Sequence, residues 1–464
     1  MAPAPSGRPV LSPAPAIDEV GDRQGALDAL VRGAVATVPF YAAHLAGCVP
    51  AAGPVRLGDL PTCTKASLAG WGRFPLAGRP MHECVRVAAT SGTTGPRLFV
   101  GYTAADWAAM SAKAGRIARH VGLGEGDTLL NVLGSGLWVG GPCFDELARA
   151  AGAGLFCPGP TGAEQVFEWC EQFPLTSITC TPSYLRLLVE RAEAEGRPLA
   201  GLGLRLAFVG GEGASAALRR HVTDAFGPGF QWTEMYGSTE VGGAVLGYGS
   251  PEPGFAGGLN IGTESYIVEL LDPHDDRPVA DGEVGEITVT TFNEGCPLIR
   301  YRTRDLAERL DGRDSSGLPR TTTILGRIDG ALKVLGALVY PSVIEELIVS
   351  AVGAGAGGAS SSPATPPRST CSPSGWRPTT GVLPAHRRTC TTGPWSAVVH
   401  AVPNGTFERF SGKAKRVQDH RPGTERSPPP VATPAGRAAV AECHEGPPRW
   451  HSVTQRRRSP GHRS

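Results

Sequence analysis

Glycines and hydroxyl-bearing residues alternate in one short segment, a combination that proteins use to bind phosphate. The segment is TSGTTG, residues 90–95, and it directly follows the strand-like run VRVAA. Glycines let the backbone approach an anion closely, while hydroxyl and amide groups donate hydrogen bonds to phosphate oxygens. The segment lacks the GK[ST] ending of a P-loop, so taken alone an ordinary turn is the simpler interpretation.

A second segment, MYGSTE at residues 235–240, combines an aromatic ring, a hydroxyl and a carboxylate at the end of the apolar run GFQWTEMYG. The Tyr236 ring offers a face for a purine, and the Thr239 hydroxyl can contact a phosphate. The Glu240 carboxylate can bind Mg²⁺, which prefers oxygen ligands. The alternative is a strand-to-loop turn with a solvated glutamate.

Arginines and aspartates gather in two later segments, RYRTRD at residues 300–305 and GRIDGALKVLG at residues 326–336. Asp305 can accept two hydrogen bonds at once, which suits a vicinal diol such as that of ribose. Arg327 can reach a phosphate as a fork-shaped donor, and the flanking glycines indicate a hinge. A surface strand with a mixed charge ladder is the alternative for residues 300–305.

A single lysine between small residues, Lys413 in FSGKAKR (410–416), could act as a mobile charge toward a developing oxyanion. By itself this segment is more simply a solvated basic run.

Strands that alternate with helices must position these residues. Helix-like spacing covers residues 26–45, and a helix is predicted over 103–123 with Thr103 as N-cap and Asp106 three residues on. Strands are predicted at 85–90, 127–133, 175–180 and 204–211, and helices at 182–195 and from about Ser215. This order predicts an α/β fold with a mostly parallel sheet. Residues 265–272 and 285–292 read as strands of a separate β subdomain.

Charge and composition divide the chain. Residues 352–464 contain 16 of the 44 Lys/Arg but only 5 of the 43 Asp/Glu, so a basic tail follows an acidic body. The eleven cysteines show no CxxC or Cys/His metal-ligand spacing. The Pro-rich start lacks the apolar core of a secretion signal, and no apolar stretch is long enough to span a bilayer. We therefore expect a cytoplasmic protein without a membrane partner.

Taken in order, the five segments resemble the adenylate-forming superfamily of acyl-CoA synthetases, and most closely its phenylacetate–CoA ligase branch. The resemblance extends from about Pro39 to Ile348. It includes GYTAADW (101–107), GLWVGG (136–141), CTPSYL (180–185) and GGEG (210–213), and RYRTRD is the spelling of this branch. The resemblance implies a large N-terminal α/β domain with a β subdomain and a small α+β C-terminal lid domain.

The resemblance also implies a reaction and a set of sites. A carboxylate attacks the α-phosphate of ATP, pyrophosphate leaves, and a thiol then displaces AMP. The residues implied to bind the nucleotide are Ser91, Gly92, Thr93, Thr94, Gly95, Gly211, Glu212, Tyr236, Gly237, Ser238, Asp305 and Arg327. Thr239, Glu240 and Lys413 are implied to be catalytic, with Mg²⁺ on Glu240. Asp329 is implied to be the hinge of the lid.

The acyl pocket of such enzymes maps onto Ser135, Trp138, Val139, Gly140 and Gly211. Close relatives place a tyrosine where Ser135 stands, so we expect an aromatic or short-chain acid other than phenylacetate. Pro96 occupies the place of a lysine after the phosphate loop, and Arg97 follows it. Residues 242–260 hold no Cys or His, so we expect none of the zinc sites that some members of this branch carry.

The end of the chain departs from the family. We expect a disordered lead-in over 1–20, the main domain over 21–326, a lid over 327–420 that is abnormal or disordered at 352–395, and a disordered basic tail over 421–464. The Ala/Arg/Pro/Gly-rich stretch resembles a shifted reading frame in GC-rich DNA, real or from sequencing. If the sequence is as written, Lys413 hangs on a disordered tether, and we expect ATP binding with weak or no adenylation.

Two alternatives to an acid–CoA ligase remain open at this stage. The thiol acceptor can be CoA or a phosphopantetheinyl carrier protein, since the acceptor contacts lie largely on the lid. A nucleotide-binding remnant without catalysis is the other. Nucleic-acid binding by the tail is not expected, because the tail lacks interleaved aromatic residues and a recognisable fold.

Overall fold

The computed structural model describes residues 23–90, 97–328, 332–334, 337–339, 387–392, 395–403 and 437–442. Side chains are described for 23–90 and 97–328. The predicted lead-in over 1–20 and most of the predicted lid and tail lie outside these residues. No helix in the described part of the chain is both long and apolar enough to span a membrane.

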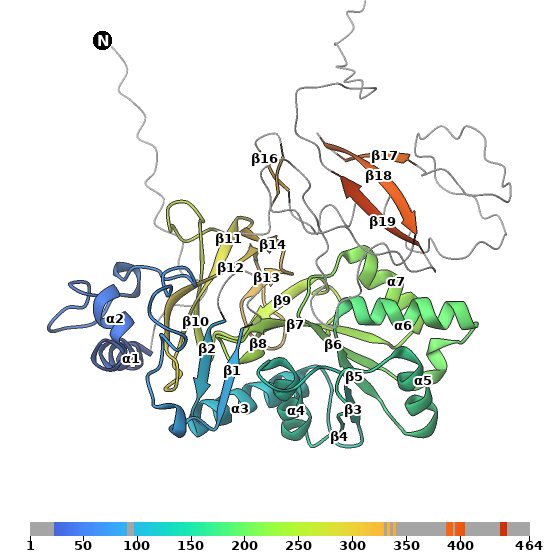
Figure 1. Cartoon of the computed structure of the whole chain (residues 1–464), viewed down its shortest axis with the longest axis horizontal. Helices are drawn as coiled ribbons and strands as arrows, with labels where there is room; N and C mark the ends of the chain where they lie inside the picture. Colours follow the sequence, from blue (N-terminus) through green and yellow to red (C-terminus); the bar gives the residue numbers. More distant parts are fainter. Residues whose placement is uncertain are drawn as a thin grey trace, which may run out of the picture.

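One hydrogen-bonded path of strands forms the framework of the molecule (Figure 1). It is a 12-stranded sheet in the order β10-β11-β12-β13-β9-β8-β7-β6-β5-β3-β4, with β14 paired to β12 off this path. Its strands are β3 (Thr128–Asn131), β4 (Gly154–Phe156), β5 (Ser177–Cys180), β6 (Leu206–Gly210), β7 (Gln231–Ser238), β8 (Gly243–Gly249), β9 (Gly258–Ile261), β10 (Tyr266–Leu271), β11 (Val284–Thr291), β12 (Leu298–Leu310), β13 (Arg320–Thr322) and β14 (Gly326–Arg327).

The strands β4, β3, β5, β6 and β7 run parallel, and helices cover both of their faces. Side chains alternate along a strand, so Leu206 and Phe208 of β6 pack against one set of helices and Ala207 and Val209 against another. The first set is α3 (Ala104–His120) and α4 (Gly140–Ala151). The second is α5 (Ala163–Gln172), α6 (Pro182–Glu195) and α7 (Ala216–Phe226). This confirms the predicted α/β class.

The strands after residue 240 are antiparallel, and β10 and β11 lie where strands were predicted at 265–272 and 285–292. The 13-residue strand β12 pairs with β11 along most of its length and with β13 at its end, and β13 pairs with β9. The hydrogen-bonded path is therefore continuous from the predicted β subdomain into the parallel strands.

The N-terminal helical region is broken, in contrast to the single helical pattern expected over 26–45. It forms α1 (Gln24–Thr37) and α2 (Pro39–His44), separated by Val38 in an extended conformation. Proline disfavours helical geometry in the residue before it, which explains the break. Both helices pack against β10, β11 and β12 in one hydrophobic core.

A two-stranded antiparallel sheet of β1 (Arg86–Ala89) and β2 (Phe99–Tyr102) carries the predicted phosphate loop. Thr90 N donates to Leu98 O at 3.0 Å, and Leu98 N donates to Thr90 Oγ1 at 3.0 Å. These two bonds hold the ends of the loop together. Residues 91–96 between them lie outside the described residues.

Short 3-10 helices occur at η2 (Leu57–Asp59), η3 (Met81–Glu83) and η4 (Leu199–Leu202). The remaining strands are β15 (Leu332–Val334) with β16 (Ala337–Val339), and β17 (Arg387–Thr392) with β18 (Trp395–Pro403) and β19 (Arg437–Glu442). Part of β17 and β18 falls within the stretch expected to be abnormal.

Candidate functional site

Three predicted nucleotide-binding residues from three strands meet at one point. The Tyr236 hydroxyl of β7 donates to Asp305 Oδ2 of β12 at 2.8 Å, and Arg327 Nη1 of β14 donates to Asp305 Oδ1 at 3.0 Å. Asp305 and Arg327 are also paired in register. The tyrosine ring is buried, and burial together with the Asp305 carboxylate raises the pKa of Tyr236 well above its usual value. The phenol therefore remains a hydrogen-bond donor that orients the carboxylate.

Glu240 and Thr239 lie just beyond the end of β7, and each accepts a hydrogen bond from a tyrosine. The Tyr301 hydroxyl donates to Glu240 Oε1 at 3.1 Å, and the Tyr102 hydroxyl donates to the Thr239 carbonyl oxygen. Burial and the Glu240 carboxylate raise the pKa of Tyr301 well above its usual value. Both phenols thus act as protonated donors that hold the segment between β7 and β8.

The turn from β7 to β8 requires glycine. A Cβ on Gly237 would lie 1.8 Å from the Gly243 carbonyl oxygen, so no side chain fits there. The neighbouring Ser238 Oγ is buried and has no hydrogen-bond partner among the described residues. Within the described part of the chain, this hydroxyl is therefore an unpaired polar group next to Thr239 and Glu240.

Two glycines border the ring of Trp138 in the predicted acyl pocket. A Cβ on Gly140 would lie 2.4 Å from Trp138 Cζ2, and a Cβ on Gly211 would lie 3.9 Å from the same atom. Gly211 also has a φ of 83°, which favours glycine. The loop before α4 and the end of β6 therefore lie close together at this indole, and the role of these residues in binding an acid remains a prediction.

The other residues predicted for the acyl pocket differ in their exposure to solvent. Val139 is buried in the core, while Ser135 is exposed to solvent. Glu212, which follows Gly211, accepts a hydrogen bond from Ser183 Oγ of α6 at 3.1 Å. Among the residues predicted to line the acyl pocket, Val139 is therefore packed in the core and Ser135 is exposed to solvent.

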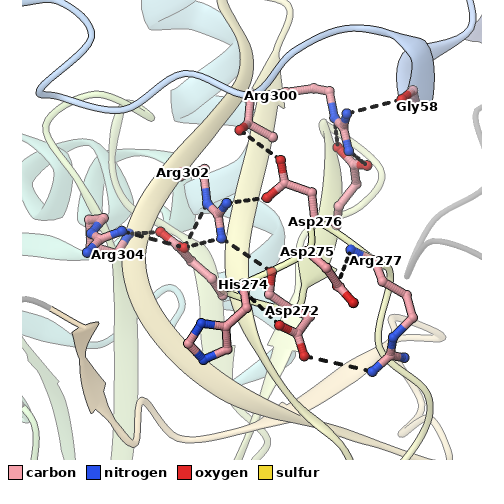
Figure 2. A network of polar contacts seen from close by, with 12 residues as sticks. Gly58, Asp272, His274, Asp275, Asp276, Arg277, Arg300, Arg302 and Arg304 are labelled. Carbon is pink, nitrogen blue, oxygen red and sulfur yellow. Dashed lines mark hydrogen bonds and ion pairs between the residues drawn. The ribbon is translucent and has the colours of Figure 1, made fainter.

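Buried ion pairs anchor β12 through Arg300 and Arg302 (Figure 2). Arg300 binds Glu269 through two nitrogens, at 3.0 and 2.9 Å, and donates to the Leu60 carbonyl oxygen at 2.6 Å. Arg302 binds Glu286 at 2.7 Å and also contacts Asp276. Figure 2 shows the Arg302 guanidinium directed toward Asp276 and Asp272. The arginines of the RYRTRD segment are therefore structural anchors, and not a surface ladder.

Comparison with known proteins agrees with this geometry. The AMP-binding enzyme family model matches residues 63–293. The phenylacetate–coenzyme A ligase of Escherichia coli K12 is 34% identical over 302 residues, which cover 63% of this chain and 67% of the relative. That of Thermus thermophilus is 32% identical over 320 residues, covering 68% and 71%. This chain belongs to the phenylacetate–CoA ligase branch of the adenylate-forming enzymes.

Solved structures agree at the level of the fold. A 2-hydroxyisobutyryl-CoA ligase in an open conformation matches with a TM-score of 0.63 at 23% identity, over 71% of this chain and 80% of that chain. The same ligase in a postadenylation state gives a TM-score of 0.64 at 22% identity, over 71% and 72%. The large domain of an adenylate-forming ligase is thus present in the chain.

Several family site residues lie outside the described part of the chain. These are the phosphate-loop residues Ser91, Gly92, Thr93, Thr94 and Gly95, the hinge residue Asp329 and the lysine Lys413. Their predicted roles remain predictions. Arg97, which follows Pro96, is exposed to solvent just before β2.

Sequence reasoning missed three contributors to this ligase site. Tyr102 and Tyr301 position residues 239 and 240, and Lys65 Nζ donates to Thr90 Oγ1 at 3.3 Å beside the phosphate loop. All three could have been nominated from the resemblance. Tyr301 stands inside the RYRTRD segment, Tyr102 stands inside GYTAADW, and Lys65 ends the stretch 60–65, which also resembles the family.

One further group of metal-capable side chains lies away from this site. His120, Glu252 and Asp314 each place a ligand atom within 4.8 Å of the others. His120 Nε2 lies 3.3 Å from Asp314 Oδ2, and Asn260 donates to the same oxygen at 2.5 Å. Burial would raise the pKa of Asp314, but hydrogen bonds from neighbouring side chains lower it to about 2. These donors to Asp314 are Ser250, Ser316 and Asn260.

Proposed function

We propose that this chain activates an aromatic or short-chain carboxylic acid with ATP and transfers the acyl group to CoA. A carboxylate oxygen of the acid attacks the α-phosphorus, the bond to pyrophosphate breaks, and an acyl adenylate forms. The thiol sulfur then attacks the acyl carbon, AMP leaves, and the thiol proton passes to solvent. This is the AMP-forming acid–thiol ligase chemistry of the family to which the chain belongs.

The observation that carries the proposal is the meeting of Tyr236, Asp305 and Arg327 beside Glu240. The Asp305 carboxylate is oriented by both neighbours, and a carboxylate can accept hydrogen bonds from the two hydroxyls of a ribose. The Arg327 guanidinium adds positive charge where a phosphate or ribose would lie. Such prepositioned groups favour the charge that develops during phosphoryl transfer.

Glu240 is the residue that would hold Mg²⁺. A carboxylate supplies the oxygen ligand that this ion prefers, and the Tyr301 hydroxyl fixes one of its two oxygens. The ion supplies charge neutralisation at the phosphates. Ser238 Oγ and Thr239 lie next to this carboxylate and complete the set of oxygen groups that the segment offers.

The acid is proposed to bind against Trp138, between Gly140 and Gly211. The indole lies directly against Gly140, where a Cβ would not fit, and Ser135 on the same loop is exposed to solvent. The proposed contact for the acid is therefore the aromatic ring itself. We propose CoA as the thiol acceptor. A phosphopantetheinyl carrier protein, which the sequence left open, is the alternative. We place the reaction in the cytoplasm, consistent with the free thiols of the described cysteines.

ATP–pyrophosphate exchange with purified full-length protein over a panel of aryl, short-chain and long-chain acids tests this proposal. We expect acid-dependent exchange with aryl or short-chain acids, and a response confined to long fatty acids would refute the pocket assignment.

Asp305→Asn should weaken ATP binding roughly 10-fold or more, since a hydrogen bond to a charged group is lost. Asp224→Asn, on the exposed face of α7, is the matched control. Coupled assays with CoA and with a phosphopantetheinyl carrier protein separate the two acceptors.

A further inference from the structure

β12 is bulged where it carries Asp305. Leu306 pairs with Glu286 and Arg302 pairs with Thr288, so residues 303–305 oppose the single residue between them on β11. Within this bulge Arg304 has a φ of 70°. A left-handed conformation at a non-glycine residue persists only where the surrounding contacts impose it.

One buried carboxylate supplies those contacts. Glu286 is fully buried, and its Oε1 accepts the backbone N–H of Arg304 at 2.9 Å. Its Oε2 accepts from Arg302 Nε at 2.7 Å and lies 2.6 Å from Arg302 Nη2. Glu286 therefore joins the residue before the bulge to the residue at its apex.

The bulge sets the direction in which the next side chain leaves the strand. Asp305 follows Arg304 directly, and its own N–H donates to Thr303 Oγ1 at 3.2 Å. Thr303 Oγ1 donates in turn to the Ile287 carbonyl oxygen at 2.8 Å, next to Glu286. The Asp305 carboxylate consequently reaches Tyr236 and Arg327 and not the buried side of β11.

We propose that Glu286 is a positioning residue that sets the recognition of the ribose hydroxyls by Asp305. It acts by holding the Arg304 N–H, and it does not itself touch the nucleotide. The inference rests on the proposed function, in which Asp305 binds ribose.

β12 contains a second bulge that serves as an internal comparison. Arg300 also has a positive φ, of 45°, and also binds a buried carboxylate, that of Glu269. Among the described residues, however, Glu269 accepts only from the Arg300 side chain, and the Arg300 N–H donates to Thr290 Oγ1 instead. Glu269→Gln therefore removes the same kind of ion pair without releasing the backbone next to Asp305.

The experiment compares the affinities of AMP, 2′-deoxy-AMP and 3′-deoxy-AMP for the full-length protein by calorimetry. The parent protein is expected to bind AMP about tenfold or more tightly than either deoxy nucleotide. Each deoxy nucleotide lacks one ribose hydroxyl and so loses one hydrogen bond to a carboxylate. Glu286→Gln is expected to bring the ratio of the affinities for AMP and for the deoxy nucleotides close to one, mainly by weakening the binding of AMP. Glu269→Gln is expected to keep the parent's ratio, even if it unfolds more readily.

The ratio is measured on the folded fraction alone, so a loss of stability does not imitate the effect. If Glu286→Gln is not recovered folded, Glu286→Asp keeps the charge but is one methylene too short to reach both partners, and the same drop is expected. A parent-like ratio in the Glu286 variant overturns the inference, as does an equal loss in both variants. A parent that binds none of the nucleotides overturns the proposed function instead.

Discussion

Lys113 of α3 is a buried cation that contacts an aromatic ring instead of a carboxylate. Its Nζ lies 4.2 Å from the centroid of the Tyr266 ring, and the Tyr266 hydroxyl donates to the Val241 carbonyl oxygen at 3.0 Å. Burial lowers the pKa of Lys113 to about 8, although the nearby Glu264 opposes the shift. Lys113 therefore links α3, through Tyr266, to the segment that follows Glu240. Its lowered pKa makes the stability of the folded protein depend on pH.

Lys113→Met is predicted to stabilise the protein at pH 7 and to lose that advantage by pH 10. Because the folded-state pKa lies below the unfolded-state value, the buried charge opposes folding below about pH 8. That opposition is relieved as the pH rises from about 8 towards 10.5. The difference at pH 7 can reach about 3 kcal/mol before the ring contact is subtracted. Urea unfolding of both proteins at pH 7, 8.5 and 10 measures it.

Arg119→Met on the same helix is the control, since Arg119 is exposed to solvent and Arg116 itself contributes to the Lys113 shift. Its difference from the parent should stay constant with pH. A constant difference for Lys113→Met as well would contradict the lowered pKa.

At the scale of elements, α3 is tied to the β strands through its own first turn. Thr103 and Asp106 form a capping box, with Asp106 N donating to Thr103 Oγ1 and Thr103 N donating to Asp106 Oδ2. The Asp106 carboxylate also accepts the N–H groups of Glu294 at 2.7 Å and Gly295 at 2.9 Å. One buried side chain thus caps a helix and fixes the loop between β11 and β12.

Asp106→Ala is predicted to destabilise the protein clearly more than Thr103→Ala. Loss of a threonine N-cap costs about 1 kcal/mol. Loss of Asp106 leaves three backbone N–H groups without their acceptor, and each buried unsatisfied group costs about 1–3 kcal/mol. We expect a total of about 3 kcal/mol or more in urea unfolding. Ser215→Ala, which removes the N-cap of α7, should resemble Thr103→Ala; equal effects of all three would refute the bridging role of Asp106.

At the scale of the whole molecule, the described nucleotide site is built entirely from residues before 328. The long strand β12 brings Tyr301 and Asp305 to β7, and β14 adds Arg327 at the end of the continuous sheet. Lys413, which the resemblance implies to be the lysine of the adenylation step, lies beyond this framework in the sequence. Nucleotide binding and adenylation are therefore expected to depend on different parts of the chain.

The parent protein is predicted to bind ATP but to catalyse pyrophosphate exchange weakly, because the sequence that should deliver Lys413 is abnormal. Lys413→Ala should leave the Kd for ATP unchanged and lower any residual exchange. Calorimetry and radiolabelled exchange on the same preparations measure the two properties. Unchanged exchange in Lys413→Ala would show that this lysine is not engaged, and Lys415→Ala is the matched control within the same basic segment.

Local patterns in the sequence were sufficient for much of the fold. The capping box of α3, the start of α6 at Pro182 and the start of α7 near Ser215 were predicted and are confirmed. Each depends on hydrogen bonds or backbone restrictions within a few residues, which a sequence shows directly. The break at Pro39 has the same local origin and could have been predicted from the proline itself.

The sequence alone also determined the family and the identity of Tyr236, Glu240, Asp305 and Arg327 as site candidates, because their types and order carry the chemistry. Only the tertiary structure decided that Asp305 is oriented by both Tyr236 and Arg327, and that Glu286 holds the bulge before it. These contacts join residues up to 69 positions apart. Such pairs depend on strand register and on bulges, where a shift of one residue turns a side chain to the opposite face, and no local pattern encodes that choice.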